Sequence, residues 1–391
     1  MIKSILFYGN PSRIHSFLKI QLANPPKGYE FKLAKSTIKT DLLNFMFNSK
    51  KIKIIYKKSL KKILPSNWRY HFFNFLLDSK ISSSQHLIFS EQILDINQPW
   101  IFEILDHPTC MTGNNYNLFL KNKKDIEKKL LSPFCKRIII VNESSLKIMK
   151  EHFSSNVTKK CVLLRAGVIP ETYKKKLNYK EIKIVFIGSL ANPDDFYMKG
   201  GLEALESFKI ISEKFLGVKL FFRNSVPNEI KKKYSNIPNL YFLDKALDLV
   251  QWKNLLKNAD ICLNPGHVYS LMATLESLNN CLSIIMLDSW GVKDYLKNDY
   301  NSILIKPSTN IKGYRNPAYP TNVRTKEFVS EIKAGDPRVI EDICSALSKL
   351  IKDKTLRQRL GSQGRKTILK KFNLNKRNKA LKKIFDYALE N

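Results

Sequence analysis

The stretch ADICLNPGHVYSLMATLESLNNCLSIIMLDSWGVKDYLKNDYNSILI, residues 259–305, decides the fold of this chain. A short apolar run, 261–263, ends at a Pro-Gly turn, and Ser270 then opens a segment whose apolar residues recur at helical spacing. A second apolar run, 282–287, leads through a short helical pattern at 292–296 to a third, 303–305. Strands that alternate with helices in this way predict a parallel sheet with crossover connections.

The same pattern predicts where a ligand binds. In open parallel sheets, ligands lie outside the carboxyl ends of the strands. In this stretch those ends carry residues 264–270 and 288–291, so Asn264 and Asp288 are candidate polar contacts. In all, strands are expected at 2–8, 100–105, 138–141, 184–187, 219–222, 240–242, 261–263, 283–287 and 303–305, and residues 307–336 read as an inserted loop.

These residues resemble the retaining nucleotide-sugar glycosyltransferases that have two facing Rossmann-like domains, the GT-B fold. Pro265, Glu276 and Asp288 stand where the donor domain of that family has a Pro-Ser turn, a helix glutamate and a strand-ending aspartate. Upstream, IKIVFIGSL (182–190) and MKGGLEALESFKII (198–211) look like the family's strand, loop and Lys-Gly helix start. Residues 352–389 look like its closing helices, and 135–153 and 162–171 are similar to the last strands of its acceptor domain.

The resemblance implies an α/β chain with two Rossmann-like domains whose parallel sheets face each other across a cleft. The acceptor-side domain is expected at 1–170, a linker at 171–181 and the nucleotide-sugar donor domain at 182–372. The last segment, 373–391, is expected to be a helix that packs back on the first domain. A chain of 391 residues is long enough for two such cores.

The resemblance also implies an active site. Lys199, before Gly200 and Gly201 at a helix start, would meet the donor diphosphate, and Glu276 would accept both ribose hydroxyls. His107 would lie near the transferred sugar, which makes His107 and Lys199 the candidate catalytic residues. The plain alternatives are an exposed lysine, a solvated helix glutamate and a structural histidine. The other candidate donor-binding residues are Gly9, Gly188, Ser189, Arg223, Asn264, Tyr269, Ser270 and Leu271, of which Ser270 would cap the helix that carries Glu276.

The chain departs from the family's pattern in places that matter. Gly188 is followed by Ser189 where the family has a diphosphate-binding arginine, and Val268 replaces the first of its two glutamates. His267 and Arg223 are candidates to supply a missing polar contact. Two alternatives therefore stay open beside a hexosyltransferase: a catalytically impaired binding or scaffold protein of the same fold, and a nucleotide-sugar epimerase.

The chain is strongly basic, with 67 Lys and Arg against 34 Asp and Glu and a net charge of +33. A composition bias towards Lys, Asn and Ile explains part of this charge but not its clustering. Seven lysines and no acid lie between Lys50 and Lys62, and an apolar face that ends at Ile63 runs along the same predicted helix. Such a helix either docks on an anionic membrane or packs its apolar face on its own sheet.

The remaining expectations concern partners and compartment. No Asp-x-Asp cluster or Cys/His metal spacing is present, so we expect a nucleotide sugar as substrate, no bound cofactor and no metal. The acceptor would be a glycan, a lipid-linked sugar or another hydroxyl compound, as in polysaccharide biosynthesis. Nucleic acid is not expected, because its recognition motifs are missing. Six scattered cysteines and the absence of a spanning segment favour a cytoplasmic protein, peripheral to the membrane if the lysine-rich helix binds lipid.

Overall fold

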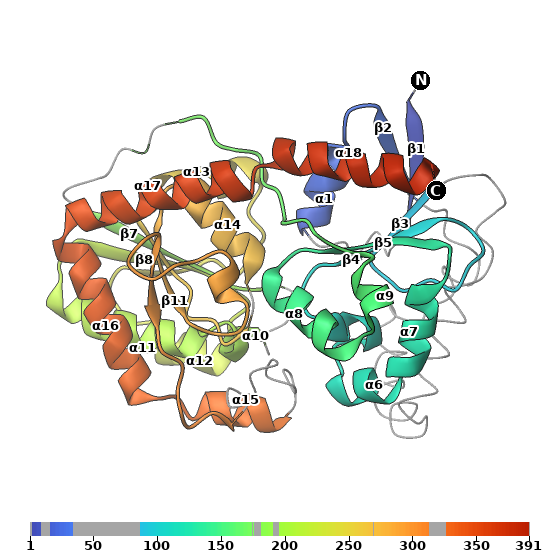
Figure 1. The fold of residues 1–391 in the computed structure, drawn as a ribbon. Coiled ribbons are helices and arrows are strands. Elements are labelled where there is room, and N and C mark those ends of the chain that lie inside the picture. Colours follow the sequence, from blue (N-terminus) through green and yellow to red (C-terminus); the bar gives the residue numbers. More distant parts are fainter. Residues whose placement is uncertain are drawn as a thin grey trace. The chain divides into compact units, whose positions relative to one another are not determined.

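The computed structural model describes residues 2–8, 16–33, 87–173, 175, 181–190, 195–268, 270–312 and 326–390. The chain divides into two compact units (Figure 1). Unit 1 comprises Met1–Arg165 and Lys376–Asn391, and unit 2 comprises Ala166–Asn375. Gly9, Tyr269, the lysine-rich segment 50–63 and most of the expected linker lie outside the described residues.

Unit 1 is built on a parallel sheet with the strand order β2-β1-β3-β4-β5-β6. The central strands are apolar on both faces, because helices cover both sides of a parallel sheet. The strands are β1 (Lys3–Tyr8), β2 (Tyr29–Leu33), β3 (Leu87–Ser90), β4 (Trp100–Ile104), β5 (Cys135–Ile140) and β6 (Cys161–Leu163). The helices are α1 (Ser16–Ala23), η3 (Pro108–Thr112), α6 (Tyr116–Lys121), α7 (Lys123–Leu131), α8 (Glu143–His152) and α9 (Ser155–Thr158).

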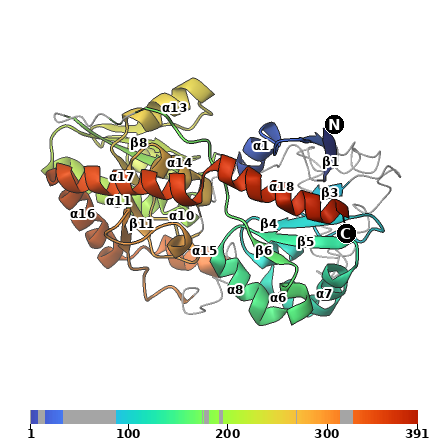
Figure 2. The same ribbon diagram turned by 45° about the horizontal axis from the view of Figure 1, so that its top comes forward.

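The last helix, α18 (Leu374–Glu390), packs on unit 1 beside α1 (Figure 2). A buried ion pair fastens it there: Arg377 Nη2 lies 2.5 Å from Glu103 Oε1 on β4, with side chains 2% and 0% exposed. Arg377 also donates to Gln21 Oε1 on α1 and to the carbonyl oxygens of Leu164 and Arg165. The guanidinium on α18 therefore joins strand β4, helix α1 and the segment after β6 in one hydrogen-bonded network.

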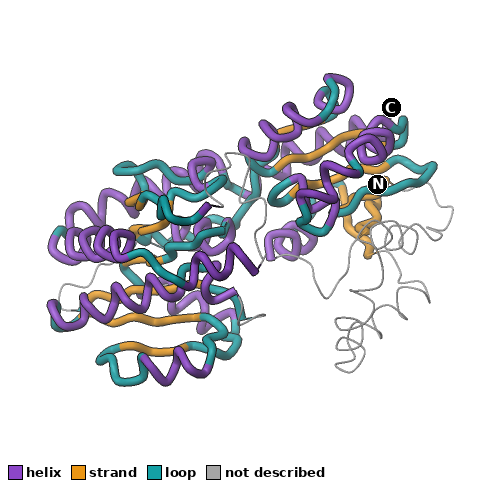
Figure 3. Tube along the Cα trace, turned by 90° about the horizontal axis from the view of Figure 1, so that it is seen from below, coloured by secondary structure: helices purple, strands orange, loops and turns teal. Residues whose placement is uncertain are grey.

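Unit 2 is built on a second parallel sheet, whose strands are orange in Figure 3. Its strand order is β12-β11-β10-β7-β8-β9. Its strands are β7 (Ile182–Ile187), β8 (Val218–Arg223), β9 (Leu240–Phe242), β10 (Ile261–Leu263), β11 (Ser283–Leu287) and β12 (Ser302–Ile305). The helical elements are α10 (Asp195–Met198), α11 (Gly201–Lys214), α12 (Asn228–Lys233), α13 (Leu249–Asn258), α14 (Leu271–Asn279), η4 (Val292–Asp294), α15 (Lys326–Lys333), α16 (Pro337–Lys352) and α17 (Lys354–Lys371).

The core of unit 2 lies between its sheet and helices α11 and α16, which pack on each other through Phe208, Ile343 and Leu347. Helices α13 and α14 lie on the other side of the sheet (Figure 1). The two helix layers leave only the strand ends of the sheet for polar chemistry. At its carboxyl edge the loops after β7, β8, β10 and β11 come together, because neighbouring parallel strands end side by side.

The expected strands are confirmed, and three of them, at 240–242, 261–263 and 283–287, have the expected bounds. Two expectations were wrong in part. The short helix at 292–296 is a 3₁₀ turn, η4, three residues long. The inserted loop at 307–336 contains helix α15, whose apolar residues Phe328 and Ile332 are one turn apart and buried.

Candidate functional site

The centre of the candidate site is a close crossing of two backbone segments in unit 2. Gly200, which precedes α11, has a φ of +75°, a conformation that glycine adopts without strain. A Cβ atom at this position would lie 2.0 Å from the carbonyl oxygen of Pro265, in the loop after β10. The Lys-Gly-Gly sequence therefore lets the turn before α11 lie against the turn before α14.

This crossing brings Lys199 to Ser270. Lys199 Nζ donates to Ser270 Oγ over 2.9 Å, and the two residues are 71 positions apart in the sequence. Ser270 occupies the N-cap position of α14 but makes no side-chain capping bond, so the expectation that its hydroxyl caps the helix was wrong. The backbone amides of the first turn of α14, from Leu271 onward, lie at the positive end of the helix dipole. The Lys199 ammonium lies beside this end, because it contacts the N-cap residue Ser270.

Glu276 lies in the second turn of α14 and takes part in a cluster with two residues from other elements. Trp252 Nε1 on α13 donates to Glu276 Oε2 over 3.2 Å. The guanidinium of Arg223, at the end of β8, lies 5.0 Å from the centre of the Trp252 ring and donates to the Gly188 carbonyl over 2.9 Å. Burial raises the pKa of Glu276, while the Trp252 hydrogen bond and the Arg223 charge lower it.

Asn264, at the end of β10, is fully buried, and neither atom of its amide has a hydrogen-bond partner among the described residues. A buried amide without a partner costs about 1–3 kcal/mol, so this side chain indicates a place for a ligand. Gly188 has a different local reason: a Cβ atom there would lie 2.1 Å from Asn224 Oδ1. Ser189 lies alongside, its carbonyl accepting from Ser225 N over 2.8 Å.

Two residues of the loop after β10, His267 and Val268, have structural roles in unit 2. His267 Nε2 lies 2.9 Å from Glu203 Oε1 on α11, and both side chains are almost completely buried. His267 therefore ties the loop after β10 to α11 through Nε2. Val268 packs with Met198, Phe328 and Ile332 in a small apolar cluster, which places α15 directly beside the Lys199–Ser270 contact.

In unit 1, His107 is buried and caps the 3₁₀ helix η3. Its Nδ1 accepts from the Thr109 amide over 3.0 Å and lies 2.9 Å from Thr109 Oγ1. Any proton transfer or sugar contact by His107 therefore depends on Nε2. Glu91, directly after β3, is a titratable group that the sequence did not single out. Burial, assisted by the Glu103 charge, raises its pKa to about 7.

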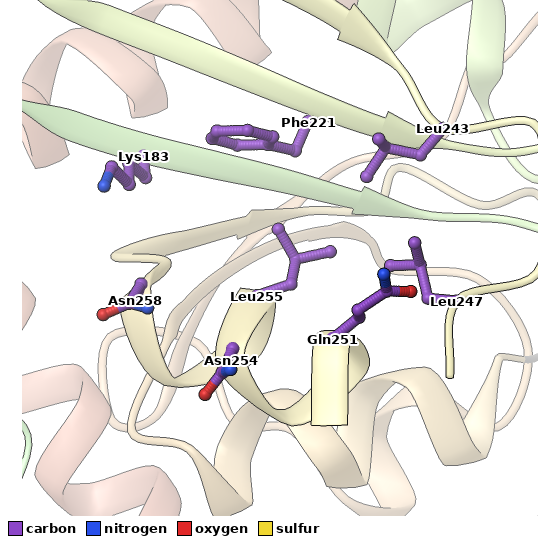
Figure 4. A pocket seen from close by; sticks show the side chains of 8 residues that line it. All are labelled: Lys183, Phe221, Leu243, Leu247, Gln251, Asn254, Leu255 and Asn258. Carbon is purple, nitrogen blue, oxygen red and sulfur yellow. The ribbon is translucent and has the colours of Figure 1, made fainter. Parts of the chain in front are cut away.

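The structure thus brings most predicted donor residues to one edge of one sheet. Sequence reasoning missed Trp252 and Glu203, because a tryptophan near the start of a surface helix and a glutamate in another helix's first turn carry no motif. An apolar pocket of about 440 Å³ lies between α13 and strands β7 and β8 (Figure 4). The described residues that line it include Lys183, Phe221 and Leu255 but none of the predicted site residues.

No cluster of three or more His, Cys, Asp or Glu side chains in the described ranges is arranged to hold a metal ion. None of the described helices combines the length and the apolar character that crossing a bilayer requires.

The fold is similar to solved glycosyltransferases. HepE from Anabaena, solved in complex with UDP and glucose, aligns with a TM-score of 0.59 at 11% identity over 99% of this chain and 100% of its own. A glycosyltransferase from Rickettsia africae aligns with a TM-score of 0.57 at 13% identity over 100% of this chain and 99% of its own. TarM aligns with a TM-score of 0.53 at 12% identity over 81% of this chain, which spans 57% of TarM.

Comparison of the sequence with protein-family models and with curated proteins gives no match. The structural similarity at this low identity carries the fold alone. The expected architecture is confirmed: the chain is an α/β protein with the GT-B fold.

Proposed function

We propose that this chain is a glycosyltransferase that moves a sugar from a nucleotide-activated donor to a hydroxyl acceptor. The observation that carries the proposal is the Lys199–Ser270 contact at the crossing of Gly200 and Pro265. It places an ammonium group and the amino end of a helix at one point on the carboxyl edge of the sheet. Both features stabilise the negative charge that develops on a leaving diphosphate.

The other residues of this edge complete the proposed donor site. Arg223 supplies the second cation that the family places where this chain has Ser189. Glu276 accepts the ribose hydroxyls through a carboxylate that Trp252 hydrogen-bonds and whose ionised form the Arg223 charge favours. The Asn264 amide pairs with the donor. The reaction uses the nucleotide sugar as a substrate, and the proposal gives no role to a bound cofactor or a metal ion.

Transfer with retention is part of the proposal and is supported by the resemblance of the Lys-Gly and helix-glutamate segments to retaining enzymes. In that mechanism the acceptor hydroxyl attacks the face of the sugar that the diphosphate leaves, and a donor phosphate oxygen takes its proton. Lys199 then stabilises the diphosphate as the glycosidic bond breaks. His107 Nε2 contacts the sugar or the acceptor.

Nucleotide binding and turnover test the proposal together. We expect a UDP, GDP, ADP and TDP panel to raise the melting temperature with one base class. Replacing Lys199 by Ala should lower transfer by about 10²-fold or more. Lys209→Ala is the matched control, because Lys209 is exposed on the same helix α11. Equal turnover in the two variants would remove Lys199 from the mechanism.

One observation favours the second candidate, a binding protein of this fold without catalysis. Val268, in place of a sugar-binding glutamate, belongs to an apolar cluster with α15. That protein would bind a nucleotide sugar and release no nucleoside diphosphate from it over hours with any acceptor. Binding with turnover decides for the transferase, and binding without turnover decides for the second candidate.

For the acceptor we propose a glycan or lipid-linked compound at the cytoplasmic face of a membrane, where segment 50–63 would bind anionic lipid. Each lysine near such a surface contributes about 1 kcal/mol, and salt weakens the attraction. The protein should therefore sediment with phosphatidylserine vesicles at low salt. A variant with Lys53, Lys57 and Lys61 changed to Glu should stay in the supernatant and still bind nucleotide. Failure of the unchanged protein to sediment would point to a soluble acceptor.

A further inference from the structure

The cluster formed by Trp252, Glu276 and Arg223 joins three elements that are distant in sequence. Trp252 belongs to α13, Glu276 to α14 and Arg223 to the end of β8. The indole Nε1–H donates to Glu276 Oε2 over 3.2 Å, and the Arg223 guanidinium lies 5.0 Å from the centre of the indole ring. One side chain therefore contacts both the carboxylate and the cation of the proposed nucleotide site.

The way α13 is attached makes this contact more important. The helix begins with a capping box formed by Asp248 and Gln251, and Trp252 is its fourth residue. Among the helix residues only Leu256 is buried, and the apolar pocket separates much of the helix from β7 and β8 (Figure 4). Leu249 and Val250, in the first turn, are each 68% exposed. Little packing holds the start of α13, so the contacts of Trp252 fix it against α14 and β8.

The charges of the cluster depend on the same side chain. Burial is the largest influence on Glu276 and raises its pKa, which favours the neutral acid. The groups that oppose this are the Trp252 hydrogen bond and the Arg223 charge. Burial also lowers the pKa of Arg223, which the Glu276 charge raises. Loss of the indole donor would therefore raise the pKa of Glu276 further.

We propose that Trp252 is a positioning residue of the nucleotide site, holding Glu276 as an oriented, ionised acceptor for the ribose hydroxyls and holding Arg223 beside it. This inference rests on the proposed function. An ionised carboxylate offers about four lone-pair positions. The Trp252 N–H occupies one of these positions, on Oε2, and thereby fixes the plane of the carboxylate. The remaining lone-pair positions, which the orientation of α14 directs, are then available to the ribose hydroxyls. The resemblance to the glycosyltransferases marks Glu276, and the tertiary structure adds the tryptophan that donates to it.

The test uses Trp252→Phe, which keeps an aromatic ring for Arg223 and removes the N–H donor. We expect the affinity for the nucleoside diphosphate selected by the panel to fall about fivefold at neutral pH, the typical effect of one hydrogen bond. Ribose hydroxyls donate to the ionised carboxylate, so affinity is lost as the pH falls through the Glu276 pKa. In Trp252→Phe that loss should occur at a higher pH than in the unchanged protein.

A double-mutant cycle separates positioning from a general structural defect. In a Glu276→Gln background no carboxyl group titrates, so adding Trp252→Phe should leave the pH dependence of binding unchanged. If Trp252→Phe has the same effect in both backgrounds, or binds nucleotide with the pH profile of the unchanged protein, the proposal is overturned.

A second measurement needs no nucleotide and so distinguishes failure of this inference from failure of the proposed function. In protein labelled with ¹⁵N-tryptophan, the Trp252 Nε1–H resonance is the one that disappears in Trp252→Phe. It should move with pH as Glu276 titrates and stay fixed in Glu276→Gln. A resonance that does not respond to Glu276 overturns the positioning contact, even if nucleotide binds. A resonance that responds in a protein that binds no nucleoside diphosphate keeps the contact and removes its assigned role.

Discussion

Replacing Gly200 by Ala tests the backbone crossing on which the proposed site depends. A φ of +75° costs an alanine about 1–2 kcal/mol. The new Cβ atom would also lie 2.0 Å from the Pro265 carbonyl oxygen, where ordinary contact begins at 3.4 Å. The two segments must therefore separate by about 1.4 Å, the difference between these distances. The added Cβ atom is bonded directly to the backbone and the Pro265 carbonyl oxygen belongs to it, so rotation of a side chain cannot relieve the contact.

That separation would break the 2.9 Å bond between Lys199 and Ser270. Because a misplacement of about 1 Å in a catalytic site can cost about 10²-fold in rate, we expect transfer to fall by that factor. Gly335→Ala is the matched control: Gly335 also has a positive φ, +69°, but the nearest atom to its added Cβ is Leu202 Cδ2 at 3.8 Å.

Urea unfolding and calorimetry with the selected nucleoside diphosphate provide the two measurements. Both variants should lose about 1–2 kcal/mol of unfolding free energy to the backbone conformation. Only Gly200→Ala should lose an additional part to the clash and bind nucleotide more weakly. If the two glycine variants bind nucleotide equally well, the crossing does not shape the site and the reasoning fails.

Two further predictions concern unit 1. The Glu91 pKa, raised to about 7 by burial, means that the folded state holds a proton that the unfolded state releases above about pH 4.5. Stability should fall as the pH rises from about 5 to 7, by up to about 1.4 kcal/mol per pH unit, and denaturant titrations of Glu91→Gln should show a smaller fall; equal slopes would refute it. Arg377→Met should cost about 3–5 kcal/mol of unfolding free energy, because it leaves the buried Glu103 charge unpaired. Arg137→Met, which removes the contact of a guanidinium with the Tyr387 ring on the same α18 and a hydrogen bond to the Lys136 carbonyl oxygen, should cost about 1 kcal/mol, and similar losses in both variants would contradict the assigned role of the ion pair.

The sequence determined the architecture of unit 2, because parallel strands that helices cover on both faces consist of continuous runs of apolar residues. Residues 261–263 and 283–287 illustrate this. All of them are buried, all but Ser283 are apolar, and the bounds of both strands are those expected. Apolar runs separated by turn residues are local patterns, so they can be recognised in a single sequence. The same patterns place Lys199 just before a helix and Asn264 at the end of a strand, whereas Glu276 was singled out by the resemblance to the glycosyltransferases.

What the sequence could not give are the contacts between segments that are distant along the chain. Trp252 meets Glu276 and Arg223, His267 meets Glu203, and Ser270 accepts from Lys199 instead of capping α14. Each pairing depends on how helices are set on the sheet. A hydrogen bond between residues 64 or 71 positions apart leaves no periodic trace in either segment. Local patterning therefore fixed the strands and the edge of the sheet at which we propose that the donor binds, whereas tertiary packing alone decided which side chains hold one another there.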